Sequence, residues 1–143
     1  MIYQQTTQVP NVLLDTYLPS LTGAELKILL VIIRQTNGWV DFRTGRRKTR
    51  DRISHSQFKE KTGLCSKIIS KAIQSLVLKG LITVTDKAGN QLPNASDRKG
   101  NPKLFYSFQP SYFIPPTMVQ SSLGLVYKSV IDKTNYTKLK RQN

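Results

Sequence analysis

Apolar residues recur at helical spacing between residues 64 and 79, and we base our interpretation of the chain on this segment. Ile69, Ala72, Ile73 and Leu76 fall on one side of a helix with this sequence, so this side is expected to pack into the core. The pattern therefore predicts an amphipathic helix whose polar side is basic. The residues expected to point outward are Lys67, Ile68, Ser70, Lys71 and Gln74.

The ends of this predicted helix carry recognisable signals. Ser66 is expected to cap the first turn, because its hydroxyl can accept a hydrogen bond from an unpaired backbone N–H. Gly80 follows the last periodic turn and suits a left-handed C-terminal cap. Residues 81–86 then have the β-branched content of a strand.

Another short helix is predicted just before the helix at 64–79. It has Ser56 as its cap and ends at Gly63. By itself, the later helix reads as an ordinary amphipathic helix with a solvated polar side. Two short helices joined by a glycine-containing turn, the second one basic, instead indicate a helix-turn-helix. We favour this interpretation.

The N-terminal part of the chain is predicted to be helical too. Residues 12–18 form a short helical segment that Pro19 should end. Thr22 and Glu25 have capping-box spacing at the start of a longer helix, which is expected to end at Gly38.

This longer helix is itself apolar on nearly all sides. Such a helix is either central in the core or shared with a second subunit in a homodimer, and we favour the central position. The main stripe is predicted at Leu26, Leu29, Leu30 and Ile33, widened by Ile28, Val31 and Ile32.

A strongly basic loop follows, in which six of the ten residues 43–52 are Lys or Arg. It is either a solvated flexible loop or a phosphate-binding segment, and we favour the second because such dense charge is usually neutralised by a polyanion. Trp39 and Phe42 are expected to anchor it by packing, and residues 53–55 to form a short strand pairing with a wing. The predicted DNA contacts here are Arg46, Arg47, Lys48, Arg50 and Arg52.

Turn residues fill positions 87–103, which predicts a long hairpin loop between residues 81–86 and a returning strand at 104–108. The fold class is thus α+β, mainly helical: a winged helix-turn-helix at 9–109 with a small antiparallel β wing, followed by an extended linker or basic tail at 110–143. The predicted DNA contacts of the wing are Lys87, Arg98, Lys99 and Lys103.

Composition narrows the choice of partner. The chain has 22 Lys and Arg against 8 Asp and Glu, a net charge of +14, which favours a polyanion. Nucleic acid ranks above a membrane, because we find no long basic amphipathic helix with bulky aromatics. The N-terminus lacks the pattern of a secretory signal, and the single cysteine fits a reducing cytoplasm.

Residues for catalysis or metal binding are sparse. His55 and Cys65 are the only residues of their kinds, so a His/Cys zinc cluster within the chain is excluded. The acidic residues are scattered and no glycine-rich nucleotide motif occurs. We expect a protein that is not an enzyme, with no catalytic residue, no metal and no cofactor.

Several motifs together resemble one family. Residues 21–26 open the long helix and 34–39 (RQTNGW) close it, 51–58 (DRISHSQF) and 61–64 follow, and 79–82 (KGLI) end the basic helix. This combination, over roughly residues 9–85, resembles the amino-terminal domain of phage replication proteins of the lambda O type and related replisome organisers.

The resemblance implies a winged-helix domain that binds repeated sites in a replication origin, while a separate carboxy-terminal region recruits a helicase or its loader. This chain departs from the family in its longer basic loop at 43–52 and in stopping soon after the wing. The resemblance thus supports origin binding more than complete initiator activity.

The leading hypothesis is a sequence-specific binder of double-stranded DNA in phage or plasmid-type replication initiation. A winged-helix transcriptional regulator is the alternative, and a non-specific nucleic-acid or protein interaction module is a third. The predicted groove contacts are Ser66, Lys67, Ile68, Ser70, Lys71 and Gln74.

Overall fold

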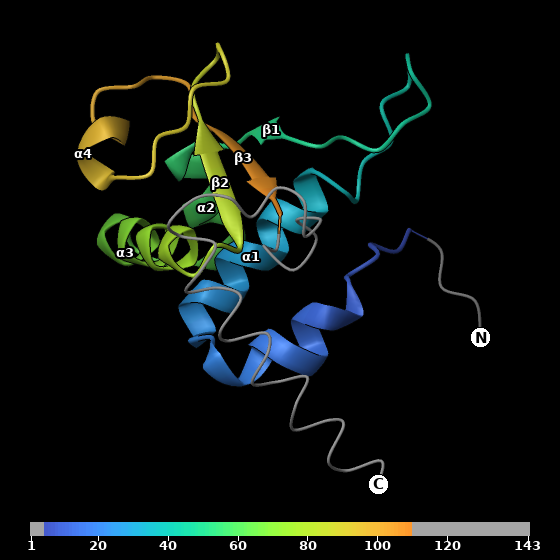
Figure 1. Ribbon diagram of the computed structural model, residues 1–143, viewed down its shortest axis with the longest axis horizontal. Coiled ribbons are helices and arrows are strands. Elements are labelled where there is room, and N and C mark those ends of the chain that lie inside the picture. The colour runs from blue at the N-terminus through green and yellow to red at the C-terminus, as the bar shows by residue number, and fades with distance from the viewer. Residues whose placement is uncertain (1–4, 110–143) are drawn as a thin grey trace, which may run out of the picture. The chain divides into compact units, whose positions relative to one another are not determined.

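The computed structural model describes residues 5–109, and it shows a mainly helical α+β fold with a three-stranded antiparallel sheet (Figure 1). The predicted tail at 110–143 lies outside the described residues. The elements are a π-helix η1 (Leu13–Tyr17), a 3-10 helix η2 (Leu18–Ser20), α1 (Gly23–Gln35), β1 (Asp51–Arg52), α2 (His55–Thr62), α3 (Ser66–Leu78), β2 (Ile82–Thr85), α4 (Ala95–Arg98) and β3 (Phe105–Phe108).

The predicted capping box of α1 is confirmed. The Glu25 backbone N–H donates to Thr22 Oγ1 over 3.2 Å, and Glu25 Oε2 accepts from the Thr22 backbone N–H at 3.0 Å. The helix ends at Gln35, earlier than the expected end at Gly38. Gly38 closes the turn that follows, and a Cβ there would lie 2.6 Å from the Arg34 carbonyl oxygen, so this turn needs glycine.

The buried stripe of α1 differs from the predicted one. Leu29 and Ile33 are buried as expected, but Leu30 is 39% exposed. The core side of the helix is completed by Ile28 and Ile32 instead. α1 contacts α2, α3 and β3, so its central position in the fold is confirmed.

Pro19 does not end the first helical segment. It lies inside η2, which continues directly from η1. Proline is tolerated there because the first positions of a helix need no backbone N–H for an internal hydrogen bond. Leu13 from this segment is fully buried and joins the core.

The helix α2 begins earlier than predicted, and its cap is Ser54, not Ser56. Ser54 Oγ accepts from the Gln57 backbone N–H at 3.2 Å, while Gln57 Oε1 accepts from the Ser54 N–H at 2.9 Å. The predicted cap was wrong because only Ser54 has a glutamine three residues later, which completes a capping box. Gly63 ends α2 as expected, and it does so in the left-handed conformation, with φ of 72°.

The helix α3 has the predicted buried side but not the predicted cap. Ile69, Ala72, Ile73 and Leu76 are all buried, which confirms the register of the helix. Cys65 occupies the N-cap position without a side-chain hydrogen bond, and Ser66 is the first helical residue.

The C-terminal end of α3 is the predicted left-handed turn. Gly80 has φ of 69°, which glycine adopts without steric cost. The turn lets the Leu81 N–H donate to the Leu76 carbonyl at 3.1 Å. The chain then passes directly into β2.

The sheet has the strand order β1-β3-β2, so the β2–β3 hairpin lies beside a strand from before the helix pair. The short strand predicted at 53–55 is displaced: β1 is Asp51–Arg52, paired with β3, whereas His55 is the first residue of α2. The long loop between β2 and β3 contains α4, which was not predicted.

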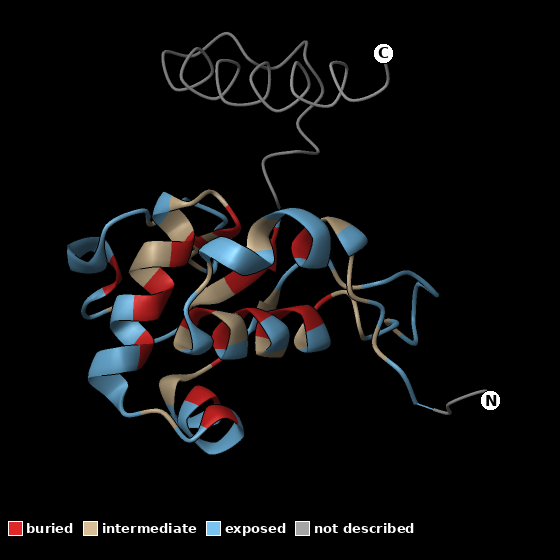
Figure 2. Cartoon of the chain, turned by 90° about the horizontal axis from the view of Figure 1, so that it is seen from below, coloured by how far each residue is buried: buried red, intermediate tan, exposed pale blue. Residues whose placement is uncertain are grey.

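The core lies between the helices and the sheet. Figure 2 shows the buried residues on the inner sides of the helices and the exposed residues on their outer sides. Phe58 of α2 and Tyr106 of β3 meet edge to face, with ring centroids 5.2 Å apart. This contact fixes α2 against the sheet, and α3 follows α2 after a short turn.

Candidate nucleic-acid interface

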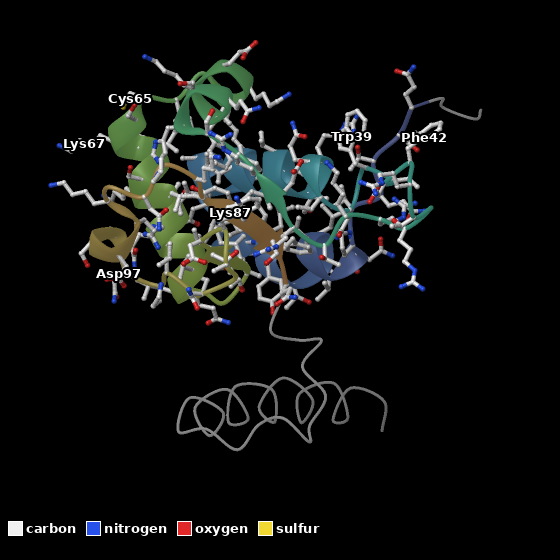
Figure 3. The ribbon with its side chains drawn as sticks, turned by 90° about the horizontal axis from the view of Figure 1, so that it is seen from above. Trp39, Phe42, Cys65, Lys67, Lys87 and Asp97 are labelled. Atoms are coloured by element: carbon white, nitrogen blue, oxygen red, sulfur yellow. The ribbon has the colours of Figure 1, made fainter. Side chains whose placement is uncertain are left out.

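The side of α3 opposite the core faces solvent. Lys67, Ser70 and Lys71 are exposed, Ile68 is 44% exposed, and Gln74 is half-buried. Figure 3 shows Lys67 projecting from the domain near Cys65, at the N-terminal end of α3. The structure therefore brings the predicted groove contacts together on one exposed surface, with Ser66 exposed in the first turn.

The other end of α3 is tied to α1 through Glu25. Lys79 Nζ lies 2.7 Å from Glu25 Oε2, and Ser75 Oγ donates to Glu25 Oε1 at 2.5 Å. Burial raises the pKa of the Glu25 carboxyl, but hydrogen bonds from Lys79, Ser75 and the Thr22 backbone, with the Lys79 charge, outweigh it, and the pKa is lowered. The ionised carboxylate thus holds the C-terminal end of α3 against α1.

Arg98 is buried and hydrogen-bonded within the protein, which the sequence did not predict. It is only 9% exposed, and its Nη1 donates to the Leu92 and Pro93 carbonyls at 2.9 and 3.1 Å. Its Nη2 donates to Gln74 Oε1 on α3. Arg98, predicted as a DNA contact of the wing, therefore holds the β2–β3 loop against α3 and has little surface left for a phosphate.

The remaining predicted contacts of the wing, Lys87, Lys99 and Lys103, are exposed. Lys87 lies in an ordered turn, in which Asp86 Oδ1 accepts from the backbone N–H groups of Gly89 and Asn90 at 2.8 and 2.9 Å. Hydrogen bonds from Asn90, with smaller contributions from neighbouring backbone N–H groups, lower the pKa of Asp86. The tip of the loop is thus shaped by its own side chains.

A pocket of about 330 Å³ lies where α3 meets this loop, and His55, Ser70 and Arg98 contribute to its lining. Tyr106 also lines it, with a buried hydroxyl that has no hydrogen-bond partner among the described residues. Burial raises the pKa of Tyr106 to about 12. Burial and the nearby Arg98 charge lower the pKa of His55, which favours the neutral imidazole.

Residues 39–48, which we call the basic hairpin, fold back on themselves. Val40 pairs with Arg47 in an antiparallel bridge, and the Asp41 N–H donates to the Arg46 carbonyl at 2.8 Å. The expected packing of Phe42 is wrong, because this residue lies in the turn and its side chain is fully exposed. Trp39 is 48% exposed, with the Arg34 guanidinium 5.2 Å from its ring centroid.

The cations of residues 43–52 that were predicted to bind phosphates differ in their partners within the protein. Arg47 Nη1 donates to the Asn37 carbonyl at 2.5 Å, and Lys48 pairs with Asp51 at 3.4 Å. Arg50 reaches the β2–β3 hairpin, where its Nη1 donates to Thr85 Oγ1 at 3.2 Å and its guanidinium covers the Phe105 ring. Two predicted contacts, Arg46 and Arg52, are exposed with no side-chain partner among residues 5–109.

These observations define a small basic α+β domain whose second paired helix exposes a cationic side and whose β-hairpin loop packs against that helix. The chain belongs to the bacteriophage replication protein O family, whose model matches residues 4–96. This match extends the resemblance found over roughly 9–85, and it supports a role in phage replication. No curated protein and no solved structure is significantly similar to the chain. Within residues 5–109, no helix is long and apolar enough to cross a bilayer.

Proposed function

We propose that the protein binds double-stranded DNA sequence-specifically at a phage replication origin, as a winged helix-turn-helix with α3 as its recognition helix. One observation carries this proposal: α3 is fixed by its buried side while its N-terminal half exposes Lys67, Ser70 and Lys71 together. Recognition helices contact base edges through such N-terminal residues.

The exposed side chains suit the major groove. Lysine donates to the guanine O6 and N7 acceptors, serine bonds to several bases, and Ile68 can contact a thymine methyl group. Because Arg98 is only a donor, the amide oxygen of Gln74 faces it and the amide NH₂ remains for a base acceptor. Gln74 is thus better placed to donate to guanine or thymine than to form the two hydrogen bonds that adenine offers glutamine.

Other cations supply binding that does not depend on sequence. Lys87, Lys99 and Lys103 on the β2–β3 loop are exposed and suited to phosphates, as are Arg43, Arg46 and Arg47 of the basic hairpin. We propose that the protein acts by binding rather than by catalysis, in the cytoplasm, and that a helicase or its loader is its protein partner. Membership of the replication protein O family supports this partner.

Selection of bound sequences from random oligonucleotides, followed by affinity measurements at physiological salt, tests the proposal. The selected site should bind roughly 10³-fold or more tightly than random DNA. Lys71→Ala should weaken binding to the selected site by about 1–3 kcal/mol more than binding to random DNA. Lys59→Ala on α2 removes the same charge and should affect both DNAs equally. Equal affinities for selected and random DNA would refute sequence-specific recognition.

Salt titrations separate phosphate binding from base recognition. Replacing both Arg46 and Arg47 with alanine should reduce the salt slope, d log K/d log[salt], by about 0.9 for each phosphate that the protein no longer neutralises. The reduction should be the same on selected and random DNA. A weakening confined to the selected site, with an unchanged slope on random DNA, would make the basic hairpin a base reader instead.

A further inference from the structure

The basic hairpin carries an aromatic ring that the fold does not use. Phe42 is 104% exposed, so its side chain makes almost no contact with the rest of the domain. Asp41 orders the turn around it, because its Oδ1 accepts from the Arg43 N–H at 2.9 Å and its carbonyl accepts from the Gly45 N–H at 2.8 Å. Gly45 has φ of 64°, a conformation that favours glycine. The ring is therefore presented on a shaped turn.

The surroundings of Phe42 are cationic. Arg43 and Arg46 lie in the same turn, and the side chains of both are without hydrogen bonds or ion pairs among the described residues. Asp41 is the only acidic residue of the hairpin, and its carboxylate already accepts the Arg43 N–H. An exposed ring beside unpaired guanidinium groups suits a ligand with both a flat apolar surface and negative charge.

The basic hairpin lies away from the proposed recognition surface. In Figure 3, Trp39 and Phe42 lie at one end of the domain, and Cys65 and Lys67 at the other. Figure 1 shows the same separation between the hairpin, which precedes β1, and α3. A ligand on Phe42 is thus held by the hairpin itself, and its binding can be tested separately from that of α3.

We infer that the basic hairpin binds single-stranded DNA, with the Phe42 ring stacked on an unpaired base and Arg43 and Arg46 on the flanking phosphates. Non-specific single-strand sites combine a cationic surface with aromatic rings in this way. In a duplex each base is stacked on the neighbouring base pairs, so the Phe42 ring has no exposed base face on which to stack. Phe42 therefore provides preference for a single strand, while the arginines provide affinity for either form.

The test uses the full chain, a fluorescein-labelled oligo(dT) and a random-sequence duplex, with affinities measured by fluorescence anisotropy. Phe42→Leu removes the ring but keeps an apolar side chain, and Phe42→Tyr is the matched control that keeps the ring. Stacking contributes about 1–3 kcal/mol per base, so Phe42→Leu should lose roughly 5- to 150-fold in oligo(dT) affinity. Phe42→Tyr should bind like the original protein, and neither change should alter duplex affinity.

Trp39 offers a second, local measurement. It is the only tryptophan of the chain and is half-exposed at the base of the hairpin, so oligo(dT) bound there should change its fluorescence. Phe42→Leu should leave the thermal midpoint unchanged, because the side chain packs on nothing. Arg46→Ala should weaken oligo(dT) and duplex binding alike.

Three results would overturn the inference. If Phe42→Leu bound oligo(dT) as tightly as the original protein, the hairpin would be only a polyanion site, and inorganic polyphosphate should then compete equally in both proteins. If Phe42→Leu weakened duplex binding as much, the ring would be a wedge in duplex DNA. If oligo(dT) did not bind at all, the surface would belong to another partner. Lys71→Ala should leave oligo(dT) affinity unchanged, because Lys71 lies on α3 and not on the basic hairpin. The single-strand inference and the duplex proposal therefore have separate readouts, and either can fail without the other.

Discussion

Replacing Glu25 with glutamine tests whether its carboxylate fixes α3 against α1. Glu25 is 5% exposed and accepts hydrogen bonds from Lys79, Ser75 and the Thr22 backbone. Glutamine keeps the length of the side chain and can still accept the Thr22 N–H. It loses the negative charge that pairs with Lys79.

The structure sets the size of the effect. A hydrogen bond that involves a charged group contributes about 1.5–3 kcal/mol, against about 0.5–1.5 kcal/mol for a neutral one. The Lys79 side chain is 32% exposed and also donates to the Ser20 carbonyl, so water and that hydrogen bond recover part of the stabilisation. We expect Glu25→Gln to lower the free energy of unfolding at neutral pH by about 1–2 kcal/mol.

The dependence on pH identifies the cause. The pKa of Glu25 in the folded protein lies below its ordinary value of 4.5, so ionisation favours the folded state. This contribution is complete above 4.5 and is lost as the pH falls through the lowered pKa. The difference between the original protein and Glu25→Gln should therefore be largest near neutral pH and shrink in acid.

Urea denaturation of both proteins, from neutral pH down to about pH 3, measures this difference. Glu60→Gln is the matched control, because Glu60 is exposed on α2 and its side chain makes no hydrogen bond or ion pair among residues 5–109. Other carboxylates titrate in all three proteins, and their effects cancel in the comparison. A difference that stayed constant across this range, or one matched by Glu60→Gln, would refute the reasoning.

Three further substitutions test the packing and the ends of α2 and α3, each by urea denaturation with the original protein as reference. Ile73→Ala should cost about 2–5 kcal/mol, because it leaves a cavity in the core; an unchanged midpoint would place Ile73 outside the core. Gly63→Ala should cost about 1–2 kcal/mol, because φ is 72° there; a stabilised protein would contradict that conformation. Ser54→Ala should cost about 1 kcal/mol and Ser56→Ala almost nothing, since only Ser54 caps α2; the reverse order would make Ser56 the cap.

Periodicity made the helix pair predictable. The buried side of α3 repeats at helical spacing, and Gly63 after α2 and Gly80 after α3 mark ends that need a left-handed residue. The capping box of α1 could also be predicted, because its two side chains, Thr22 and Glu25, interact within one turn. Features determined by a few neighbouring residues can be recognised before the fold is known.

The errors arose where distant contacts or closely spaced alternatives decided the outcome. Ser56 was predicted as the cap of α2, but Gln57 favours Ser54, two residues earlier. Phe42 was expected to pack because aromatic residues usually do, but the bridge between Val40 and Arg47 places it in the turn.

The structural role of Arg98 could be predicted only in part. Asn94 occupies the N-cap position of α4, which asparagine favours. Its side chain caps no backbone N–H there, and its Nδ2 instead donates to Asp97 Oδ2 at 3.0 Å. The short helix α4 brings the guanidinium of Arg98 to the Leu92 carbonyl and to Gln74. The asparagine at position 94 was thus a local signal for the start of α4, but nothing local indicates that Arg98 reaches α3.

Two interactions from outside the helix pair thus determine how α3 is presented. Glu25 holds its C-terminal end through Lys79, and Arg98 holds its middle through Gln74. Neither Glu25 nor Arg98 has the exposure to bind DNA itself, since both are at least nine-tenths buried. On the proposal that α3 is a recognition helix, it reads bases only in one orientation within the groove. Removing either interaction should then reduce preference for the selected site more than binding to random DNA. The basic hairpin shares neither interaction, so its binding of a single strand should not change.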